Sequence, residues 1–531
     1  MDVEAVIATF GTVDVVARDR AVGAASPDCG RSSNRVHDSY QRRLRDLPLA
    51  EQSVVIHLTV RCFLCCSARK TPARMTVSLS FAGAERQVPQ LLDEMSRADD
   101  ADFNSRADPT GWSIRTGPPG RCVKRAWDDR ETNHKERDFM GGKGQLHVSA
   151  ELAGVLERID ALGGMLDERA DAAEELGRLP EDTARALLDT GIVRAELPLS
   201  LGGYEFAPRQ LIETAERTSY HDASAGWTLF ALQMVTGTTA AYLARDAAAE
   251  LFPDVPSGRY ALLAGHGTRP GRAVPVEGGF QVSGQWQFAS GMAHATHIHS
   301  AIQVEGTDEL RVLAMPKSQV TLDGNWDVLG LRATHSIDYH CTDVYVPHEY
   351  TYLATTDTPV NGGAVYRLGL VNMSAIGHTG WALGVGRRLL DELKRVAAAR
   401  AGSRGAAVDT SQFHAEYAMA EARFRAARAW VYDIWQEVEQ SLDQGESPST
   451  EQDTLIRLVL NHTTSTVYEV GSAVHRWAGS AAIRRGPVDR FLRDLGTGAQ
   501  HITSSPVVLQ NCGRWMSGAQ PDARWSFLDL T

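Results

Sequence analysis

The sequence lacks any run of about 18 apolar residues, the length that a helix needs to cross a bilayer. Its first residues, MDVEAVIATFGTVDVVARDR, also lack the basic start and apolar core of a signal peptide. From both absences we expect a soluble, cytoplasmic protein.

Positive charge is scarce in most of the chain. The 531 residues carry 54 Lys+Arg and 66 Asp+Glu, a formal net charge of −12. Residues 1–140 hold 21 basic and 20 acidic side chains, so the rest holds 33 against 46, a net −13. Such an acidic body repels phosphate backbones and anionic lipids, and we expect neither nucleic acid nor membrane as a partner.

Cysteine is also scarce outside the first quarter. Five of the seven cysteines lie there, and only Cys341 and Cys512 follow. Isolated cysteines of this kind are typical of reduced, buried thiols, and they exclude a disulfide framework in the main body. The hydrophobic share of 43% is enough to build a large core in several domains.

The first 75 residues resemble the zinc ribbon of insertion-sequence transposases, on the segments SPDCGRSSNRVHDSYQRRLRDLP and SVVIHLTVRCFLCCSARKTPARMT. A ribbon needs two closely spaced thiolate pairs around one metal. Here Ser26 stands where a cysteine would precede Cys29, and the second pair is scrambled into Cys62, Cys65 and Cys66. The site is degenerate, and we expect no bound metal.

Residues 81–140 are rich in Asp, Arg and Gly, show no sustained periodicity and are interrupted by TGPPGR. We therefore expect a poorly ordered extension over residues 1–140. Our interpretation is a transposase remnant joined to an enzyme whose natural start lies near Met140. A regulatory domain is the alternative.

The remaining chain changes period twice. Residues 146–256 place apolar side chains at three- and four-residue spacing, which predicts a helical domain. Residues 257–355 are short alternating runs separated by Gly, Pro and Asp, which predict a β-sheet domain. Residues 360–531 return to helical spacing and predict a C-terminal four-helix bundle. The expected fold is thus a multi-domain α+β protein.

Several motifs occur in an informative order: ELPLSLGG, SAGW, WQFASG, WDVLGLRATHSIDYHCTDVYVP and RFLRDLGTGAQH. In this order and spacing they resemble the acyl-CoA dehydrogenase superfamily, and within it the oxygenase halves of two-component flavin monooxygenases. The resemblance runs from about Gln145 to the C-terminus. It implies a reduced flavin cofactor (FMN or FAD), O2, a small organic substrate, a separate flavin reductase and a homotetrameric assembly.

The resemblance also implies site residues. Ser290 of FASG would approach the flavin N5, Phe288 would wall the flavin slot, and Trp227 would cover part of the ring or substrate. A small hydroxyl donor suits this place, because a bulky side chain would block the ring. The alternatives are a turn-forming Ser290 and a core Trp227.

The residue type at position 501 distinguishes between two enzyme classes of this superfamily. In many acyl-CoA dehydrogenases a Glu shortly after an Arg-Asp pair removes the substrate proton. Here Arg493–Asp494 is followed by GTGAQHITSSP, with His501 in the place of that Glu. The resemblance to the oxygenase branch makes His501 an acid/base or stabilising group near the flavin, since an imidazole titrates near neutral pH. An FAD-dependent acyl-CoA dehydrogenase with another base is the alternative.

Two further segments are implied in cofactor binding. Gly479 and Ser480 would approach the flavin of the same or a neighbouring subunit, and Arg404 would bond a flavin phosphate. This loop lacks the usual RxxFG pattern, which weakens the case for tightly bound FAD.

The run HATHIHS contains three histidines. His297 and His299 would share one face of a strand, whereas His294 points away, and no acidic partner is near in the sequence. We expect no metal site here and expect His294 to face the substrate.

Overall fold

The computed structural model describes six strands within residues 2–63 and the whole of residues 149–531. The chain divides into two compact units, Met1–Lys135 and Glu136–Thr531. Residues 64–148 lie outside the described residues, and so does the expectation of poor order there. The side chains of the cysteines in the first unit also lie outside the described residues, and so does the expectation that they bind no metal.

The first unit contains a four-stranded sheet in the order β1-β2-β6-β5, in which β2 and β6 are parallel, and a short β3-β4 pair. Its strands are β1 (Asp2–Thr9), β2 (Thr12–Arg18), β3 (Ala24–Ala25), β4 (Ser32–Ser33), β5 (Val36–Leu49) and β6 (Gln52–Phe63).

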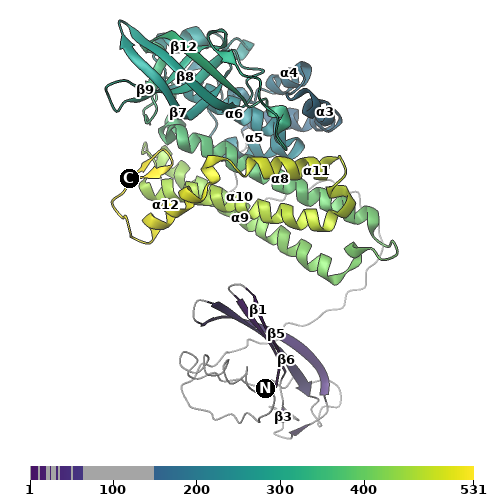
Figure 1. The fold of residues 1–531 in the computed structure, drawn as a ribbon. Helices are drawn as coiled ribbons and strands as arrows, with labels where there is room; N and C mark the ends of the chain where they lie inside the picture. Colours follow the sequence, from purple (N-terminus) through teal and green to yellow (C-terminus); the bar gives the residue numbers. More distant parts are fainter. Residues whose placement is uncertain are drawn as a thin grey trace. The chain divides into compact units, whose positions relative to one another are not determined.

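The second unit begins with helices, as the three- and four-residue spacing predicts (Figure 1). They are α2 (Ala150–Ala161), α3 (Gly163–Leu176), α4 (Glu181–Asp189), α5 (Pro208–His221), α6 (Ala223–Tyr242) and α7 (Arg245–Leu251). Helix α6 begins sharply because the Asp222 carboxylate caps it, accepting the Ala225 N–H at 2.8 Å. Nearly every side chain of α6 is buried, which makes it the central helix of this part.

A seven-stranded sheet follows, in the order β11-β12-β8-β7-β9-β10-β13. Its strands are β7 (Leu263–Val276), β8 (Gly279–Ala289), β9 (His297–Val304), β10 (Leu310–Pro316), β11 (Thr321–Leu322), β12 (Ile337–Pro347) and β13 (Thr351–Leu353). Trp286 is fully buried and stacks on Tyr339 at 5.3 Å. Gly271 and Gly284 leave room for it, since a Cβ at either would lie within 2.6 Å of the indole.

The C-terminal part is helical, with three long helices, α8, α9 and α10, that run side by side in Figure 1, and two shorter ones. Helices α5 and α6 both pack against α8, so the two helical regions share one core. The elements are α8 (Gly369–Arg400), α9 (Ser411–Asp443), α10 (Thr450–Ala478), α11 (Pro487–Gly498), α12 (Pro506–Met516), β14 (Trp525–Ser526) and β15 (Asp529–Leu530).

The predicted order of helices, sheet and helices is confirmed. Among the described residues, no helix combines the length and the apolar character that a bilayer crossing requires.

Candidate active site

A chain of hydroxyl groups joins α6 to the loop before β12. Ser290 lies in the tight turn after β8, and its Oγ accepts the indole N–H of Trp227 at 3.0 Å. The same Oγ lies 2.8 Å from Ser336 Oγ, which lies 2.6 Å from Thr334 Oγ1. Thr334 in turn donates to the Leu331 carbonyl at 2.8 Å. Sequence motifs pointed to Ser290 and Trp227, whereas Ser336 stood unremarked inside the quoted GLRATHS motif.

The turn that presents Ser290 has an unusual backbone. Phe288 has φ +61°, in the left-handed region that non-glycine residues rarely adopt. Its N–H donates to Asp338 at 3.2 Å, and its carbonyl accepts the Ser290 N–H at 3.0 Å. The Phe288 side chain stays 60% exposed, with one edge toward Trp326. A strained, held turn of this kind is common at functional sites.

Trp227 also connects Ser290 to His501. The Trp227 ring lies 5.6 Å from the His501 ring and 5.1 Å from that of His378. The two imidazoles stack on each other at 4.1 Å, with an interplanar angle of 28°. Trp381 and Phe230 complete the aromatic cluster at 4.9 and 5.1 Å from Trp227. The structure therefore brings together Trp227, Ser290 and His501, three of the residues that the sequence motifs suggested.

His378 was not predicted, although a histidine inside the small and apolar run SAIGHTGW was a usable signal. Its Nδ1 lies 2.8 Å from the Ser374 carbonyl, which can only accept, so Nδ1 carries the proton and Nε2 a lone pair. Burial lowers the pKa of His378 to about 4. The ring is therefore neutral at physiological pH.

His501 is held in the complementary tautomer. Its Nδ1 accepts the Thr503 N–H at 3.4 Å, capping the short helical turn Ile502–Ser504, and lies 2.9 Å from Thr503 Oγ1. In the neutral ring the proton therefore sits on Nε2. The Trp381 ring can lie against the end of α11 because residue 498 is a glycine: a Cβ there would lie 2.2 Å from Trp381.

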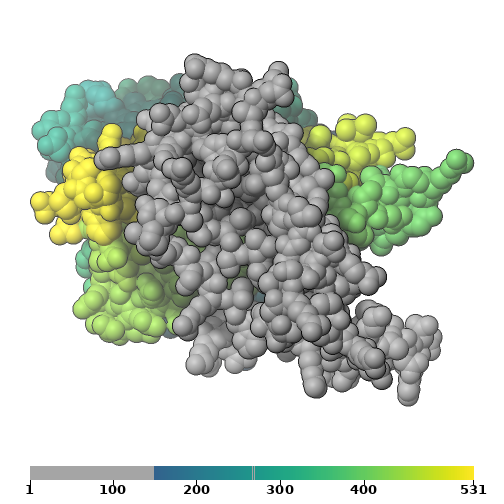
Figure 2. All heavy atoms as spheres, turned by 90° about the horizontal axis from the view of Figure 1, so that it is seen from below, coloured from purple at the N-terminus to yellow at the C-terminus, as the bar shows by residue number. Residues whose placement is uncertain are grey.

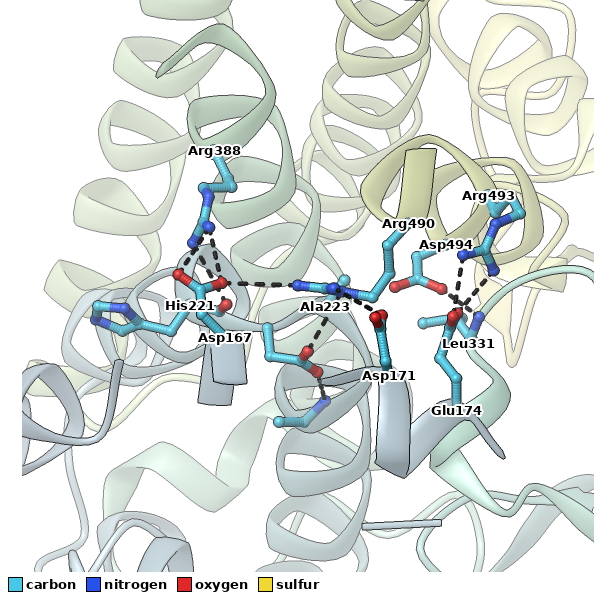
Figure 3. A network of polar contacts seen from close by, with 12 residues as sticks. Asp167, Asp171, Glu174, His221, Ala223, Leu331, Arg388, Arg490, Arg493 and Asp494 are labelled. Carbon is cyan, nitrogen blue, oxygen red and sulfur yellow. Dashed lines mark hydrogen bonds and ion pairs between the residues drawn. The ribbon is translucent and has the colours of Figure 1, made fainter. Parts of the chain in front are cut away.

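Helix α11 is fixed to the loop that carries Ser336 through Asp494 (Figure 3). The buried Asp494 carboxyl accepts the Leu331 N–H at 2.5 Å. Burial, with the nearby negative charge of Asp222, raises the pKa of Asp494 to about 8. Beside it, the buried Arg490 guanidinium lies between Asp167 at 3.6 Å and Asp222 at 3.9 Å. This network holds the His501 and Ser336 segments in a fixed relation.

Arg404, Gly479 and Ser480 lie elsewhere. The exposed Arg404 follows α8, and Ser480 Oγ accepts from Arg400 at the end of that helix, at 3.2 Å. Twenty-two residues of one helix separate Arg400 from His378, about 33 Å at 1.5 Å per residue. The turn between α8 and α9 protrudes at the opposite end of the helical region from the C-terminal segment (Figure 2). Within one chain these three residues do not meet Ser290.

The three histidines of HATHIHS separate as well. His299 is buried on β9, 3.1 Å from Thr239 Oγ1, and the half-buried His297 lies 2.9 Å from Thr296 Oγ1. His294 lies in the turn before β9, with its side chain only 6% exposed. No cluster of His, Cys, Asp and Glu suited to a metal occurs within residues 149–531.

The site residues fit a flavin ring. Ser290 and Ser336 offer hydroxyls that can donate or accept, and the exposed Phe288 beside them leaves an apolar face that a planar ring would cover. Ser290, Phe288 and Trp227 would hold the ring, and His501 would lie beside Trp227.

Comparison with known proteins also points to a flavin enzyme. The family described as "Acyl-CoA dehydrogenase, C-terminal domain" matches residues 376–506, and the zinc finger of transposases IS204/IS1001/IS1096/IS1165 matches residues 26–66. Indole-3-acetate monooxygenase of Pseudomonas putida is 29% identical over 394 residues, covering 71% of this chain and 98% of that protein.

Two further relatives point the same way. The flavin-dependent monooxygenase oxygenase subunit HsaA of Mycobacterium tuberculosis is 28% identical, covering 66% of this chain and 92% of its own. The crystal structure of 3-HSA hydroxylase from Rhodococcus sp. RHA1 shares the fold, with a TM-score of 0.65, 23% identity, and coverage of 69% and 97%.

The chain thus matches the acyl-CoA dehydrogenase superfamily over residues 376–506 and resembles flavin-dependent monooxygenases over about two thirds of its length, and the matched transposase segment confirms the second resemblance. Within the superfamily it is a flavin-dependent oxidoreductase of the oxygenase branch, as the sequence predicted.

Proposed function

We propose that this enzyme uses reduced flavin and O2 to insert one oxygen atom into a small aromatic substrate beside Ser290 and His501. The other oxygen atom leaves as water, and the flavin supplies the two electrons and two protons of the balance. The observation that carries the proposal is the Trp227 side chain, which bonds Ser290 at 3.0 Å and contacts the His501 ring at 5.6 Å.

Ser290 positions the flavin. Its Oγ accepts from Trp227, so its own proton is available for Ser336 or for a flavin nitrogen. Trp227 is 8% exposed, and with Phe230 and Trp381 it excludes water from one side of the site. Exclusion of water matters because it limits the loss of activated oxygen as hydrogen peroxide.

His501 handles a proton. In its protonated form the ring can give a proton to the oxygen atom that leaves as water, and the neutral ring that results, with Nδ1 accepting from Thr503, can then take up the proton that the substrate releases. His378 stacks on it and stays neutral, so no second positive charge opposes protonation of His501. His378 is in this account a positioning residue.

The dehydrogenase alternative needs a base at the flavin, which in many acyl-CoA dehydrogenases is a Glu shortly after the Arg-Asp pair. After Asp494 the next carboxylate in the sequence is Asp522. Asp494 itself is 1% exposed and is used to bind the Leu331 N–H. Neither is placed as a base for a substrate, which favours the oxygenase reaction.

We further propose that Arg404, Gly479 and Ser480 serve a flavin held mainly by another subunit of a homotetramer. The distance of about 33 Å along α8 supports this, because one ring cannot contact both ends of that helix. Exposed apolar side chains on the helical region, among them Met419, Tyr468 and Ile483, are suited to subunit contacts. Light scattering at micromolar concentration tests the assembly, and a monomer would contradict it.

A separate reductase would supply the reduced flavin, either FMN or FAD, in the cytoplasm. The N-terminal unit has no part in the proposed chemistry. A chain beginning at Met140 should therefore bind flavin as the full chain does, and loss of soluble protein on that truncation would contradict this.

The proposal is tested by titrating the full chain with reduced FMN and reduced FAD under anaerobic conditions and then admitting O2 with a panel of aromatic substrates. Oxygenated product in proportion to flavin consumed is expected. Flavin oxidation that yields hydrogen peroxide alone with every substrate would contradict it.

A further inference from the structure

A cluster of basic side chains lies next to the hydroxyl chain, and of its members only His294 has so far been given a role, as a residue expected to face the substrate. It consists of His294, Lys317 and His335, with Arg178 near them, and is called the basic cluster below. Its members come from separate connections: the turn before β9, the turn after β10, the segment before β12 and the loop before α4. Basic residues that converge from four separate connections suggest a ligand-binding site.

Hydrogen bonds place the members close together: the Gly291 N–H donates to the Thr334 carbonyl, next to His335, at 2.8 Å, and Lys317 Nζ donates to the Met292 carbonyl, near His294, at 3.2 Å. The positive charges of His335, Lys317 and Arg178 act on His294, and those of Arg178 and Lys317 act on His335. Burial is the main cause that lowers the pKa of His294, His335 and Lys317. The protein therefore gathers basic groups and partly removes them from water, which favours the neutral form of the two imidazoles, and a bound anion would favour their protonation.

Two nitrogen atoms of the cluster lack partners. His294 Nε2 and His335 Nδ1 are both buried without a hydrogen bond to any residue that the structure describes. The nearest carboxylate, Glu181, lies 4.0 Å from His294 Nδ1, beyond hydrogen-bond distance, and is 82% exposed. Lys317 Nζ donates to the Met292 carbonyl at 3.2 Å and has two further protons to donate.

The cluster adjoins the proposed flavin position. His335 precedes Ser336, whose Oγ lies 2.8 Å from Ser290 Oγ. His294 follows Ser290 by four residues, and its N–H donates to the Gly291 carbonyl at 2.9 Å. His335 has φ +47° and ψ +50°, so the backbone accepts strain to hold an imidazole where glycine would be relaxed.

We propose that the basic cluster binds the carboxylate of the substrate, so that the enzyme acts on small aromatic acids. This inference rests on the proposed function, because it assigns the substrate class of the same site. The flavin phosphate is the other anion that such chemistry would bind. The two sources are distinguished below by comparing FMN with riboflavin.

The test uses three acids, indole-3-acetate, phenylacetate and 4-hydroxyphenylacetate, with their uncharged amides as matched probes. Binding to the flavin-loaded full chain is measured by calorimetry. We expect at least one acid to bind about tenfold or more tightly than its amide, since a bond to a charged group is stronger than one to a neutral group. Equal binding of every acid and its amide, or no binding of any acid, would overturn the proposal.

Variants locate the effect. His335→Gly suits the left-handed backbone and should fold, and together with His294→Gln and Lys317→Gln it should lower acid affinity about tenfold while leaving amide affinity unchanged. Glu181→Gln removes the one nearby negative charge and should raise acid affinity slightly. His297→Gln is the matched control, because His297 responds to Glu250 and to no member of the cluster. Equal loss of acid and amide would overturn the assignment.

Two parallel measurements separate this proposal from the proposed function. If the cluster held the flavin phosphate instead, His335→Gly would weaken FMN binding but not riboflavin binding, and acid binding would be unchanged. If wild type bound no reduced flavin at all, the proposed function would fail whatever the acids do. Acid selectivity lost in the variants with flavin oxidation intact would support the cluster alone.

Discussion

The imidazoles of His378 on α8 and His501 after α11 stack at 4.1 Å, and each has a ring nitrogen fixed by a backbone partner. One ring presents a lone pair at Nε2 and the other a proton at Nε2. The pair joins two segments that are far apart in the sequence, and Trp227 connects it to Ser290.

The first prediction concerns the pH dependence of stability. The pKa of folded His378 is about 4, below the value of about 6.5 expected in the unfolded chain. As pH falls from about 6.5 to about 4, the unfolded chain takes up a proton that the folded chain does not, so about 3 kcal/mol of stability is lost. Below about pH 4 both states are protonated and the loss ends.

His378→Phe should flatten the Tm profile between pH 6.5 and 4, measured by scanning fluorimetry. His414→Phe, at an exposed position on α9, is the control and should keep the wild-type slope. An unchanged slope in His378→Phe would show that this ring is not the titrating group.

The second prediction concerns His501. His501→Ala should bind reduced flavin nearly as well as wild type, because Ser290 and Trp227 remain. Product formation should fall about a hundredfold or more, and hydrogen peroxide should rise. His501→Asn keeps a side-chain acceptor for the Thr503 N–H and separates lost capping from lost proton transfer. A wild-type ratio of product to peroxide in both variants would exclude a catalytic role.

The third prediction distinguishes the two serines. Ser290→Ala removes the acceptor of the Trp227 N–H and should cost about 1–3 kcal/mol of stability. It should also weaken reduced-flavin binding about tenfold. Ser336→Ala leaves the Trp227–Ser290 bond in place and should have the smaller effect on both quantities. Fluorescence titration and chemical denaturation measure them, and Ser472→Ala on the exposed face of α10 is the control. A larger effect of Ser336→Ala would contradict the assignment.

Most of the fold and part of the candidate site could be predicted from the sequence, because the signals for them are local. Alternating runs such as LRVLAMP coincide with strands, here β10, and the three- and four-residue spacing of residues 146–256 coincides with helices. Motif order identified Ser290, Trp227 and His501, which the structure brings together. His378 and Ser336 could not be found in this way, since their roles arise from contacts between distant elements.

Arg404, Gly479 and Ser480 show the opposite case. Motif position assigned Gly479 and Ser480 to the flavin of the same or a neighbouring subunit and Arg404 to a flavin phosphate, and within one chain the 32-residue helix α8 sets them apart from Ser290. Only an assembly could unite them, and a single sequence carries no direct signal of how subunits pair.

The fourth prediction concerns Asp494. Burial raises its pKa to about 8 when folded, against about 3.9 when unfolded. As pH rises from about 4 to about 8, the unfolded carboxyl ionises while the folded one keeps its proton, so the folded state loses stability over that range. Asp494→Asn keeps an oxygen for the Leu331 N–H and does not titrate.

The Tm of Asp494→Asn should therefore exceed that of wild type increasingly from pH 4 to pH 8. The exposed Asp529→Asn is the control and should follow wild type throughout. A constant difference, or a lower Tm at pH 8, would mean that Asp494 is ionised in the fold and pairs with its arginine neighbours.

The most direct test of the account is a single turnover of the full chain loaded with reduced flavin, mixed with ¹⁸O2 and the aromatic acids and amides named above. Mass spectrometry of the products gives the result. The account predicts one ¹⁸O atom in each product molecule and a second in water, with one flavin oxidised per product. It would be contradicted if no probe took up label while an added acyl-CoA reduced the oxidised, FAD-loaded enzyme in the absence of oxygen.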